Sequence, residues 1–268
     1  MVSTSFGAVV LFIFGLIMGS FLNVVATRMG TGVGVGGRSK CDHCGTALRW
    51  YELVPVLSFL ALGGKCRTCR ARLSWSHPLV ELATGVVFAV AAVGLAYHGS
   101  MPRFLLELVM MSSVVVIAAY DARHMIIPQV PLALFLGTAV IAPGALSDGL
   151  AFSMDNLFAG LVLFAPFYIL WRVSDGRWIG LGDADLAACI GLYLGLAAGF
   201  GAIVLAFGIG AAYATCVLVG AAFGKRYRRE VPFAPFLLAG FFVAYAAVSI
   251  PAFGVWTSGI IDSLTLVL

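Results

Sequence analysis

Long apolar segments dominate the chain and restrict it to a membrane fold. The sequence of 268 residues is 62% hydrophobic and only 10% charged, whereas a soluble globular domain has about 25% charged residues. A helix that crosses a bilayer needs about 20 predominantly apolar residues, and the alternating pattern of a membrane β-barrel is absent. We therefore predict an all-α, polytopic membrane helical bundle with about eight transmembrane helices, near residues 5–27, 79–97, 103–120, 128–146, 157–172, 184–199, 202–223 and 232–250.

The two ends of the chain are apolar but differ in how continuous their apolar runs are. The N-terminal segment lacks a basic stretch and a small-residue cleavage site, so we expect a retained helix rather than a removed signal peptide. The tail 251–268 is apolar but is interrupted by glycine and by Asp262. It can lie at the membrane interface or add a partial ninth span, and the sequence does not decide between the two.

The segment 28–78 differs from the rest in composition. It holds four of the six cysteines and eight of the sixteen Lys and Arg residues. A segment this short rarely builds a sufficient core alone and usually needs a staple such as a metal. We therefore divide the chain into a first transmembrane helix (1–27), a small extramembrane domain (28–78) and a transmembrane core (79–268).

Basic residues indicate the orientation of the chain in the membrane. If 28–78 lies in the cytoplasm and eight spans follow, fifteen of the sixteen Lys and Arg residues lie on the cytoplasmic side and only Arg103 lies outside. The net charge of +4 then describes a basic face next to anionic membrane lipid. Because no dense basic tract with interleaved aromatic residues is present, we do not expect nucleic-acid binding.

Four cysteines in 28–78 have the spacing of a metal site. Cys41-x-x-Cys44 and Cys66-x-x-Cys69 fit a tetrahedral site in which four thiolates hold structural zinc. His43 lies inside the first motif and is a competing ligand. The alternative is a pair of disulfides, but thiols in the cytoplasm stay reduced.

Two carboxylates at the ends of predicted spans suggest acid–base chemistry. Asp121 ends the third span and Asp183 begins the sixth, and the predicted topology puts both at the cytoplasmic end of the bundle. Two carboxylates held close together cannot both ionise easily, so they share a proton. One can then activate water while the other protonates a carbonyl oxygen, as in an aspartic protease.

The residues around Asp183 leave alternatives open. We expect Gly180 and Gly182 to allow backbone conformations that a Cβ would block, so that an unwound helix start admits a substrate strand. Asp183 could instead be a helix N-cap. Asp185 is a second candidate for the catalytic carboxylate, and His124 either tunes the pair or lies at the membrane interface.

Other polar residues in the apolar runs have functional and structural interpretations. Glu81 is an intramembrane acid, and so either functional or the partner of a cytoplasmic-side Lys or Arg. Asn23 is expected to hydrogen-bond a neighbouring helix. Arg103 and Glu107, one helical turn apart, are expected to pair.

Taken in order, these motifs resemble the type IV prepilin peptidases, which belong to the GxGD group of intramembrane aspartyl proteases. The resemblance covers most of the chain. Its motifs are GSFLNVVATR at 19–28, the four cysteines, ELVPVLSFLALGGKC at 52–66, HPLVELATG at 77–85, DARHMIIPQ at 121–129 and GLGD at 180–183. The resemblance implies that Asp121 and Asp183 are the catalytic pair.

The resemblance also implies substrates, a cofactor and a location. Such enzymes cut the leader of type IV prepilins or type II secretion pseudopilins at the cytoplasmic face of the bacterial inner membrane, and they methylate the new N-terminus from S-adenosylmethionine. Three positions depart from the family pattern: Asp185 stands where Lys is common, Gln129 where Asp is common, and Met29 where Pro is common.

Three other functions are compatible with the same sequence features. A peptidase without methyltransferase activity would have the same carboxylate pair. A membrane transporter could use intramembrane Asp residues to carry protons or cations, but its carboxylates would line a path at the membrane midplane. A zinc-bearing membrane scaffold would need neither carboxylate.

Overall fold

A computed structural model describes residues 2–32, 34–41, 43–144, 154–223 and 231–250. The tail 251–268 and the basic residues between 224 and 230 lie outside these ranges, as do the expectations that concern them. So does the end of the predicted span 128–146.

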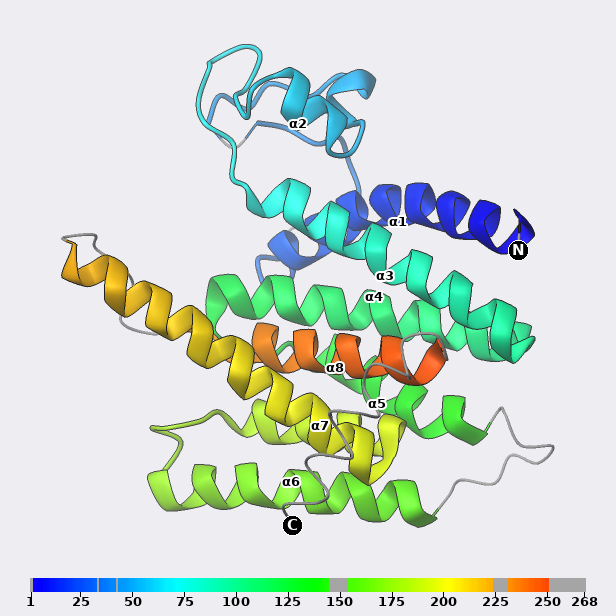
Figure 1. Cartoon of the computed structure of the whole chain (residues 1–268). Helices are drawn as coiled ribbons and strands as arrows, with labels where there is room; N and C mark the ends of the chain where they lie inside the picture. The colour runs from blue at the N-terminus through cyan, green and yellow to red at the C-terminus, as the bar shows by residue number, and fades with distance from the viewer. Residues whose placement is uncertain (1, 33, 42, 145–153, 224–230, 251–268) are drawn as a thin grey trace. The chain divides into compact units, whose positions relative to one another are not determined.

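The described residues form helices, as predicted (Figure 1). Their only β-type pairings are two isolated bridges, Lys40 with Ala47 and Lys65 with Arg72. In its described part, every predicted apolar run lies on a helix, with two of the runs on one long helix, and two short helices lie between the first two runs. The helices are α1 (Val2–Arg28), η1 (Trp50–Leu53), α2 (Leu57–Ala61), α3 (Ser76–His98), α4 (Met101–His124), α5 (Gln129–Gly144), α6 (Met154–Ser174), α7 (Leu181–Ala222) and α8 (Ala234–Ser249).

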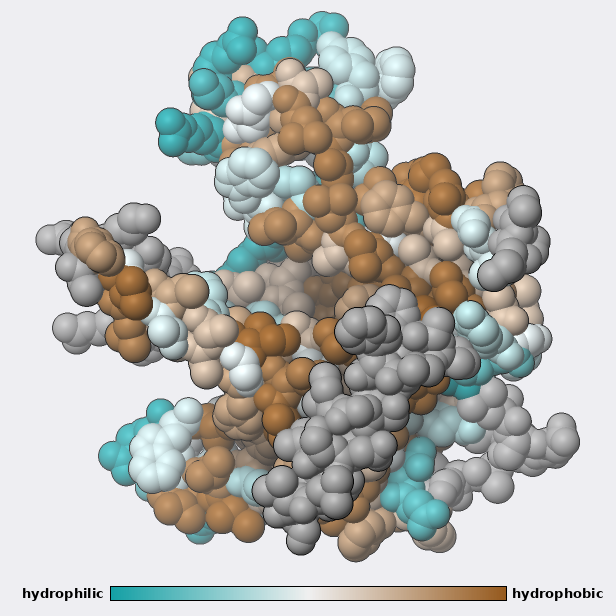
Figure 2. Space-filling model, in the orientation of Figure 1, coloured by the Kyte–Doolittle hydropathy of each residue, from teal (hydrophilic) through white to brown (hydrophobic). Residues whose placement is uncertain are grey.

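Five of these helices, α1, α3, α4, α6 and α7, are long and apolar enough to cross a membrane, and α5 and α8 are shorter apolar helices. Helix α7 contains both of the predicted runs 184–199 and 202–223. Its backbone leaves the helical conformation at Gly195 (φ 77°, ψ 179°), which divides α7 into two arms. Hydrophobic side chains cover much of the helices in Figure 2, and the chain is a multi-pass membrane protein.

The chain divides into two compact units, Met1–Val93 and Gly94–Leu268. In the first unit, Gly15 and Gly19 lie one helical turn apart and let α1 approach α3 closely. A Cβ on Gly15 would lie 2.8 Å from the Gly85 Cα, and a Cβ on Gly19 would lie 2.7 Å from the Glu81 Cα. Small residues at this spacing are typical of tightly crossing membrane helices.

A hydrogen bond joins the same two helices near their cysteine-bearing connection. The Asn23 Nδ2 and His77 Nδ1 atoms are 2.6 Å apart. The prediction that Asn23 bonds to a neighbouring helix is therefore confirmed.

In the second unit, α7 packs against α5, α6 and α8, and α4 packs against α5 and α8. The predicted pair is present: Arg103 Nε donates to Glu107 at 2.7 Å, and both residues are buried. The hydroxyls of Tyr193 and Tyr245 also donate to Glu107, each at 2.9 Å. One carboxylate thus joins α4, α7 and α8, and its hydrogen-bond partners compensate for its burial.

Candidate functional site

Asp121 and Asp183 line one cavity of the second unit, with a volume of about 630 Å³. Both carboxylates are buried and interact electrostatically. The sequence prediction that these two residues meet is in agreement with this geometry. Most of the remaining lining is apolar or backbone, from Met125, Ile126, Ile127, Trp178, Ile179, Gly180, Gly182, Phe207, Val231, Pro232 and Phe233, together with Gln129.

The end of α4 positions Asp121. Met125 takes a left-handed conformation (φ 55°) and its N–H donates to the Asp121 main-chain carbonyl at 2.8 Å, which ends the helix. The chain then turns through Ile127 and Pro128 into α5. The backbone N–H of Ala234, the first residue of α8, lies near the Asp121 carboxylate and interacts favourably with its charged form. The second carboxylate oxygen, Oδ2, is buried without a hydrogen-bond partner among the described residues, so it remains available to another molecule in the cavity.

The start of α7 positions Asp183. The helix begins at Leu181 with Gly180 as N-cap, so Asp183 lies in the first turn. Its Oδ2 accepts a hydrogen bond of 3.3 Å from the Gly180 N–H. The alternative in which Asp183 itself is the N-cap is therefore wrong; the side chain reaches back to the N-cap. The helix N-terminus favours a negative charge at this place.

The two glycines before Asp183 do not produce the unwound helix start that the sequence predicted. Gly180 has φ −77° and ψ 149°, which any residue adopts, and an added Cβ would contact only Asp183 Oδ2, at 3.5 Å. Gly182 lies inside the helix, and a Cβ there would be 2.8 Å from Ile127 Cδ1. The helix start is thus regular rather than unwound. Gly182 is needed because α7 packs closely against the segment that follows Asp121.

The other two candidates at this site do not line the cavity. Neither Asp185 nor His124 is among the described residues that line it. Asp185 is half-buried on α7, and His124 is exposed, with its ring packed on Tyr120 at a centroid distance of 4.4 Å. Their roles as modulators of the pair stay predictions.

Four cysteines of the first unit form a cluster. The Sγ atoms of Cys41, Cys44, Cys66 and Cys69 all lie within 4.8 Å of one another, and none is in a disulfide. Four thiolates around a tetrahedral zinc ion would lie about 3.8 Å apart, and the Cys41 and Cys69 sulfurs are 3.9 Å apart. His43 is not part of the cluster. These four residues could therefore hold one metal ion.

The two halves of the cluster repeat one backbone design. The Cys41 N–H donates to the Thr46 carbonyl at 3.0 Å, and the Cys66 N–H donates to the Ala71 carbonyl at 2.8 Å. Hydrogen bonding with the side chain and backbone of Thr46 lowers the pKa of the Cys44 thiol to about 6. This favours the thiolate, which is the form that binds a metal.

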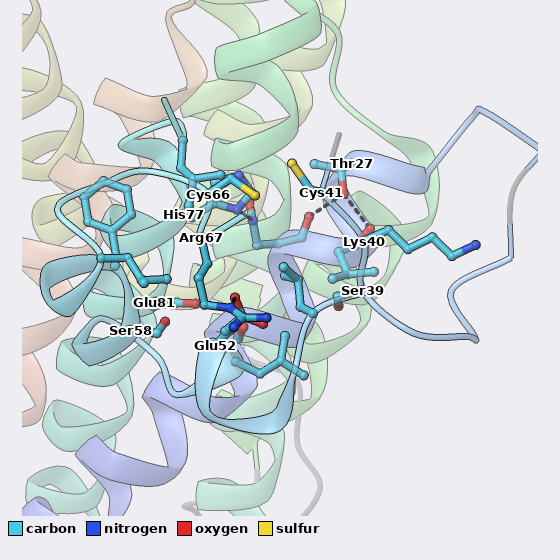
Figure 3. A pocket seen from close by; sticks show the side chains of 18 of the residues that line it. Thr27, Ser39, Lys40, Cys41, Glu52, Ser58, Cys66, Arg67, His77 and Glu81 are labelled. Atoms are coloured by element: carbon cyan, nitrogen blue, oxygen red, sulfur yellow. Dashed lines mark hydrogen bonds and ion pairs between the residues drawn. The ribbon is translucent and has the colours of Figure 1, made fainter. Parts of the chain in front are cut away.

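A second cavity, of about 280 Å³, lies in the first unit beside this cluster (Figure 3). Cys41 and Cys66 form part of its wall. Glu81 also lines it, and this carboxylate accepts a hydrogen bond of 2.8 Å from the Val56 N–H, where the sequence suggested a Lys or Arg partner. Glu52, Arg67 and His77 line the same cavity. Sequence analysis gave no individual role to Glu52 or His77, although both lie in motifs of the family resemblance, because nothing in the sequence shows that the two motifs meet at one cavity.

Comparison with known proteins places both sites inside matched segments. Residues 13–95, which carry the cysteine cluster, match the bacterial peptidase A24 N-terminal domain. Residues 108–215, which carry Asp121 and Asp183, match the type IV leader peptidase family.

Three similar proteins are each named prepilin leader peptidase/N-methyltransferase. The protein of Bacillus subtilis (strain 168) is 35% identical over 244 residues, which cover 88% of this chain and 92% of the relative. That of Myxococcus xanthus (strain DK1622) is 36% identical over 211 residues, 74% of this chain and 59% of the relative. That of Burkholderia pseudomallei (strain 1026b) is 33% identical over 258 residues, 85% of this chain and 81% of the relative. No solved structure matches the chain. From the matched segments and these identities, the chain belongs to the type IV leader peptidase family.

Proposed function

We propose that this protein cleaves the leader peptide of type IV prepilins or type II secretion pseudopilins and then methylates the new N-terminal amine. The observation that carries the proposal is the shared cavity of Asp121 and Asp183. Family membership supports it, because the similar proteins are named for both activities.

In the proposed cleavage the two carboxylates share one proton. The ionised carboxylate removes a proton from water, whose oxygen attacks the scissile carbonyl carbon. The protonated carboxyl group gives its proton to the carbonyl oxygen, so no full negative charge develops there. Breakdown of the tetrahedral intermediate returns a proton to the leaving amine. Apolar side chains such as Trp178, Phe207 and Phe233 would surround the peptide on either side of the cut.

We further propose that cleavage takes place at the cytoplasmic face of the inner membrane. Asp121 lies in the last turn of α4 and Asp183 in the first turn of α7, so both carboxylates are at helix ends. A transporter would place its carboxylates at the middle of the helices, and this position therefore favours the peptidase. The excess of Lys and Arg on one side of the predicted topology supports the cytoplasmic assignment.

The cysteine cluster is proposed to hold structural zinc. Four thiolate ligands complete a tetrahedral site and leave no position open for a substrate. Such an ion would tie the two halves of 28–78 together and hold the walls of the adjoining cavity, to which Cys41 and Cys66 belong.

One experiment tests the proposed function. Purified protein is incubated with a prepilin, with and without S-adenosylmethionine, which would supply the methyl group, and the products are weighed by mass spectrometry. We expect loss of the leader in both reactions and the added mass of one methyl group only with the methyl donor. A cleaved product that never gains this mass would reduce the protein to a peptidase, and an uncut prepilin would contradict the proposal.

A further inference from the structure

A groove beside α2, here called the α2 groove, lies in the first unit and contains neither a cysteine nor a carboxylate. Its volume is about 520 Å³. It is bounded by the end of α2, by the turn that follows α2 and by the last residues before α3. The side chains on which the following steps depend are Phe59, Leu60, Lys65, Arg72 and Trp75.

Two basic residues are paired directly with each other in this groove. Lys65 and Arg72 form an antiparallel bridge, and both are exposed. Like charges directly opposite each other in such a pair are destabilising. Neither cation forms an ion pair within the described part of the chain. A bound anion would therefore remove an unfavourable interaction at this place.

The other half of the cysteine cluster forms the same turn without this second charge. There the equivalent bridge pairs Lys40 with Ala47. Each bridge begins one residue before the first cysteine of its half, so Ala47 stands where the second half has Arg72. The turn itself does not require a cation at this position. The charge of Arg72 is thus an addition that the fold does not explain and that a ligand would.

Exposed apolar side chains accompany the basic pair. Leu60 is 62% exposed and Trp75 is 66% exposed, although both line the groove. Leu57, one helical turn before Leu60 on α2, is exposed as well. The Trp75 ring is held by an edge contact with the buried Phe59 ring, at a centroid distance of 4.9 Å. In Figure 2, hydrophobic side chains gather where Figure 1 labels α2, and exposed apolar surface of this kind marks an interaction site.

The groove lies next to a membrane-spanning helix in the chain. Trp75 directly precedes α3, which begins at Ser76 and is long and apolar enough to cross a membrane. Helix α1, at the other end of the cysteine-bearing connection, is also such a helix. The connection is therefore attached to the bilayer at both ends. Tryptophan is enriched at the level of the lipid headgroups, and Lys and Arg residues close to a membrane helix attract anionic lipids.

We propose that the α2 groove binds the headgroup of an anionic phospholipid from the surrounding membrane. Lys65 and Arg72 hold the phosphate, while Leu57, Leu60 and Trp75 enter the layer of the glycerol and the first acyl carbons. A free phosphate ion would satisfy the charges but would leave the apolar side chains exposed to water. An acidic peptide would lack the acyl chains that cover them. The lipid is the partner that matches both parts of the surface, and its binding holds α2 on the membrane.

Photo-cross-linking locates the lipid without a prepilin, so the result does not depend on the proposed function. The full-length protein is placed in phosphatidylcholine nanodiscs with a phosphatidylglycerol probe that is photoreactive near its headgroup, and labelled peptides are identified by mass spectrometry. We expect label within residues 57–75 that falls with added salt and with unlabelled phosphatidylglycerol. Absence of label from 57–75 would overturn the proposal. Equal displacement by soluble glycerol phosphate would identify a free-anion site, and displacement by an acidic peptide a protein partner; either would also overturn it.

A matched pair of variants tests the charges. Arg72→Ala introduces the residue that the other half has at this place, so the turn should still form. We expect labelling of 57–75 to fall by about fivefold, the effect of one basic residue at an anionic membrane surface, and to return in Arg72→Lys. Arg70→Ala removes the same charge from an exposed residue outside the groove and should label like the parent protein. Parental labelling of Arg72→Ala, or an equal loss in Arg70→Ala, would overturn a specific site.

A third variant tests the apolar part and keeps both charges. Leu60→Ser alters an exposed side chain, so the first unit should still fold, and limited proteolysis of 28–78 checks this for every variant. We expect less labelling by the phosphatidylglycerol probe than in the parent protein, because the serine cannot enter the acyl layer. Unchanged labelling of Leu60→Ser would show that the groove holds an anion without contact to the lipid chains, and would overturn the proposal.

Discussion

The two cavities differ in the charge that lines them and in how the chain builds them. Around Asp121 and Asp183, no basic residue is among the described lining residues, and both carboxylates come from the ends of long helices. The cavity beside the cysteine cluster has acids and bases, and much of its wall comes from a connection whose described residues form two short helices. Packed helices can hold the first arrangement unaided. The cavity of the first unit depends on the cysteine cluster. We therefore expect that a change which disrupts one cavity leaves the other intact.

The largest effect is expected when the carboxylate pair is broken. Asp121→Asn and Asp183→Asn should each lower the cleavage rate by a factor on the order of 10³ or more, because half a pair can neither share the proton nor activate water. Cleavage of a synthetic prepilin, followed by mass spectrometry, measures the rate.

Asp185→Asn is the control for this comparison, since Asp185 does not line the cavity. It should retain most of the cleavage. A dead Asp185→Asn together with an active Asp183→Asn would mean that the catalytic carboxylate is assigned to the wrong residue.

Metal removal should affect mainly the first unit. Purified protein is expected to carry close to one zinc ion, and Cys41→Ser or Cys66→Ser should lower the metal content and expose 28–78 to proteolysis. The cavity of Asp121 and Asp183 should persist. Elemental analysis and limited proteolysis measure these effects. A metal-free protein whose segment 28–78 resists proteolysis would contradict a structural metal in the cysteine cluster.

A single added methyl group should distinguish the two glycines before Asp183. Gly182→Ala places a Cβ 2.8 Å from Ile127 Cδ1, and overpacking of this kind destabilises by about 1–3 kcal/mol. We expect cleavage to fall by about tenfold to a hundredfold. Gly180→Ala should be tolerated, because its Cβ meets only an ordinary contact of 3.5 Å. Cleavage rates of the two variants check this order, and equal losses would show that close packing at Gly182 is not the cause.

The smallest effect is expected inside the cysteine cluster. Gly45 (φ 68°) and Arg70 (φ 58°) occupy equivalent positions, four residues after Cys41 and Cys66. A left-handed conformation is unfavourable for a residue with a Cβ by about 1–2 kcal/mol, and part of the gain from glycine is lost as chain entropy. Arg70→Gly should therefore raise the free energy of unfolding of the first unit by about 0.5–1 kcal/mol, and Gly45→Ala should lower it, as measured by denaturant titration. A destabilised Arg70→Gly would contradict the equivalence of the two halves.

Sequence analysis predicted the features that depend on local pattern. Apolar runs located the helices, cysteine spacing located the cluster, and the order of the motifs singled out Asp121 and Asp183. It did not locate the break at Gly195, because several other glycines lie nearby in the same run and periodicity does not choose among them. It also explained Gly182 wrongly, by an unwound helix start. The structure instead requires a glycine there because Ile127, which is distant in the sequence, packs against it. The cavity beside the cysteine cluster was missed because its lining residues converge only in the folded chain.

The buried carboxylate of Glu107 has a mechanical consequence for the catalytic pair. It accepts hydrogen bonds from α4, α7 and α8, and the same three helices carry Asp121, Asp183 and Ala234. At 1.5 Å of rise per residue, about 21 Å of helix separates Glu107 from Asp121. A tilt of α4 by about 3° about Glu107 would therefore displace its Asp121 end by about 1 Å, enough to slow a reaction about a hundredfold.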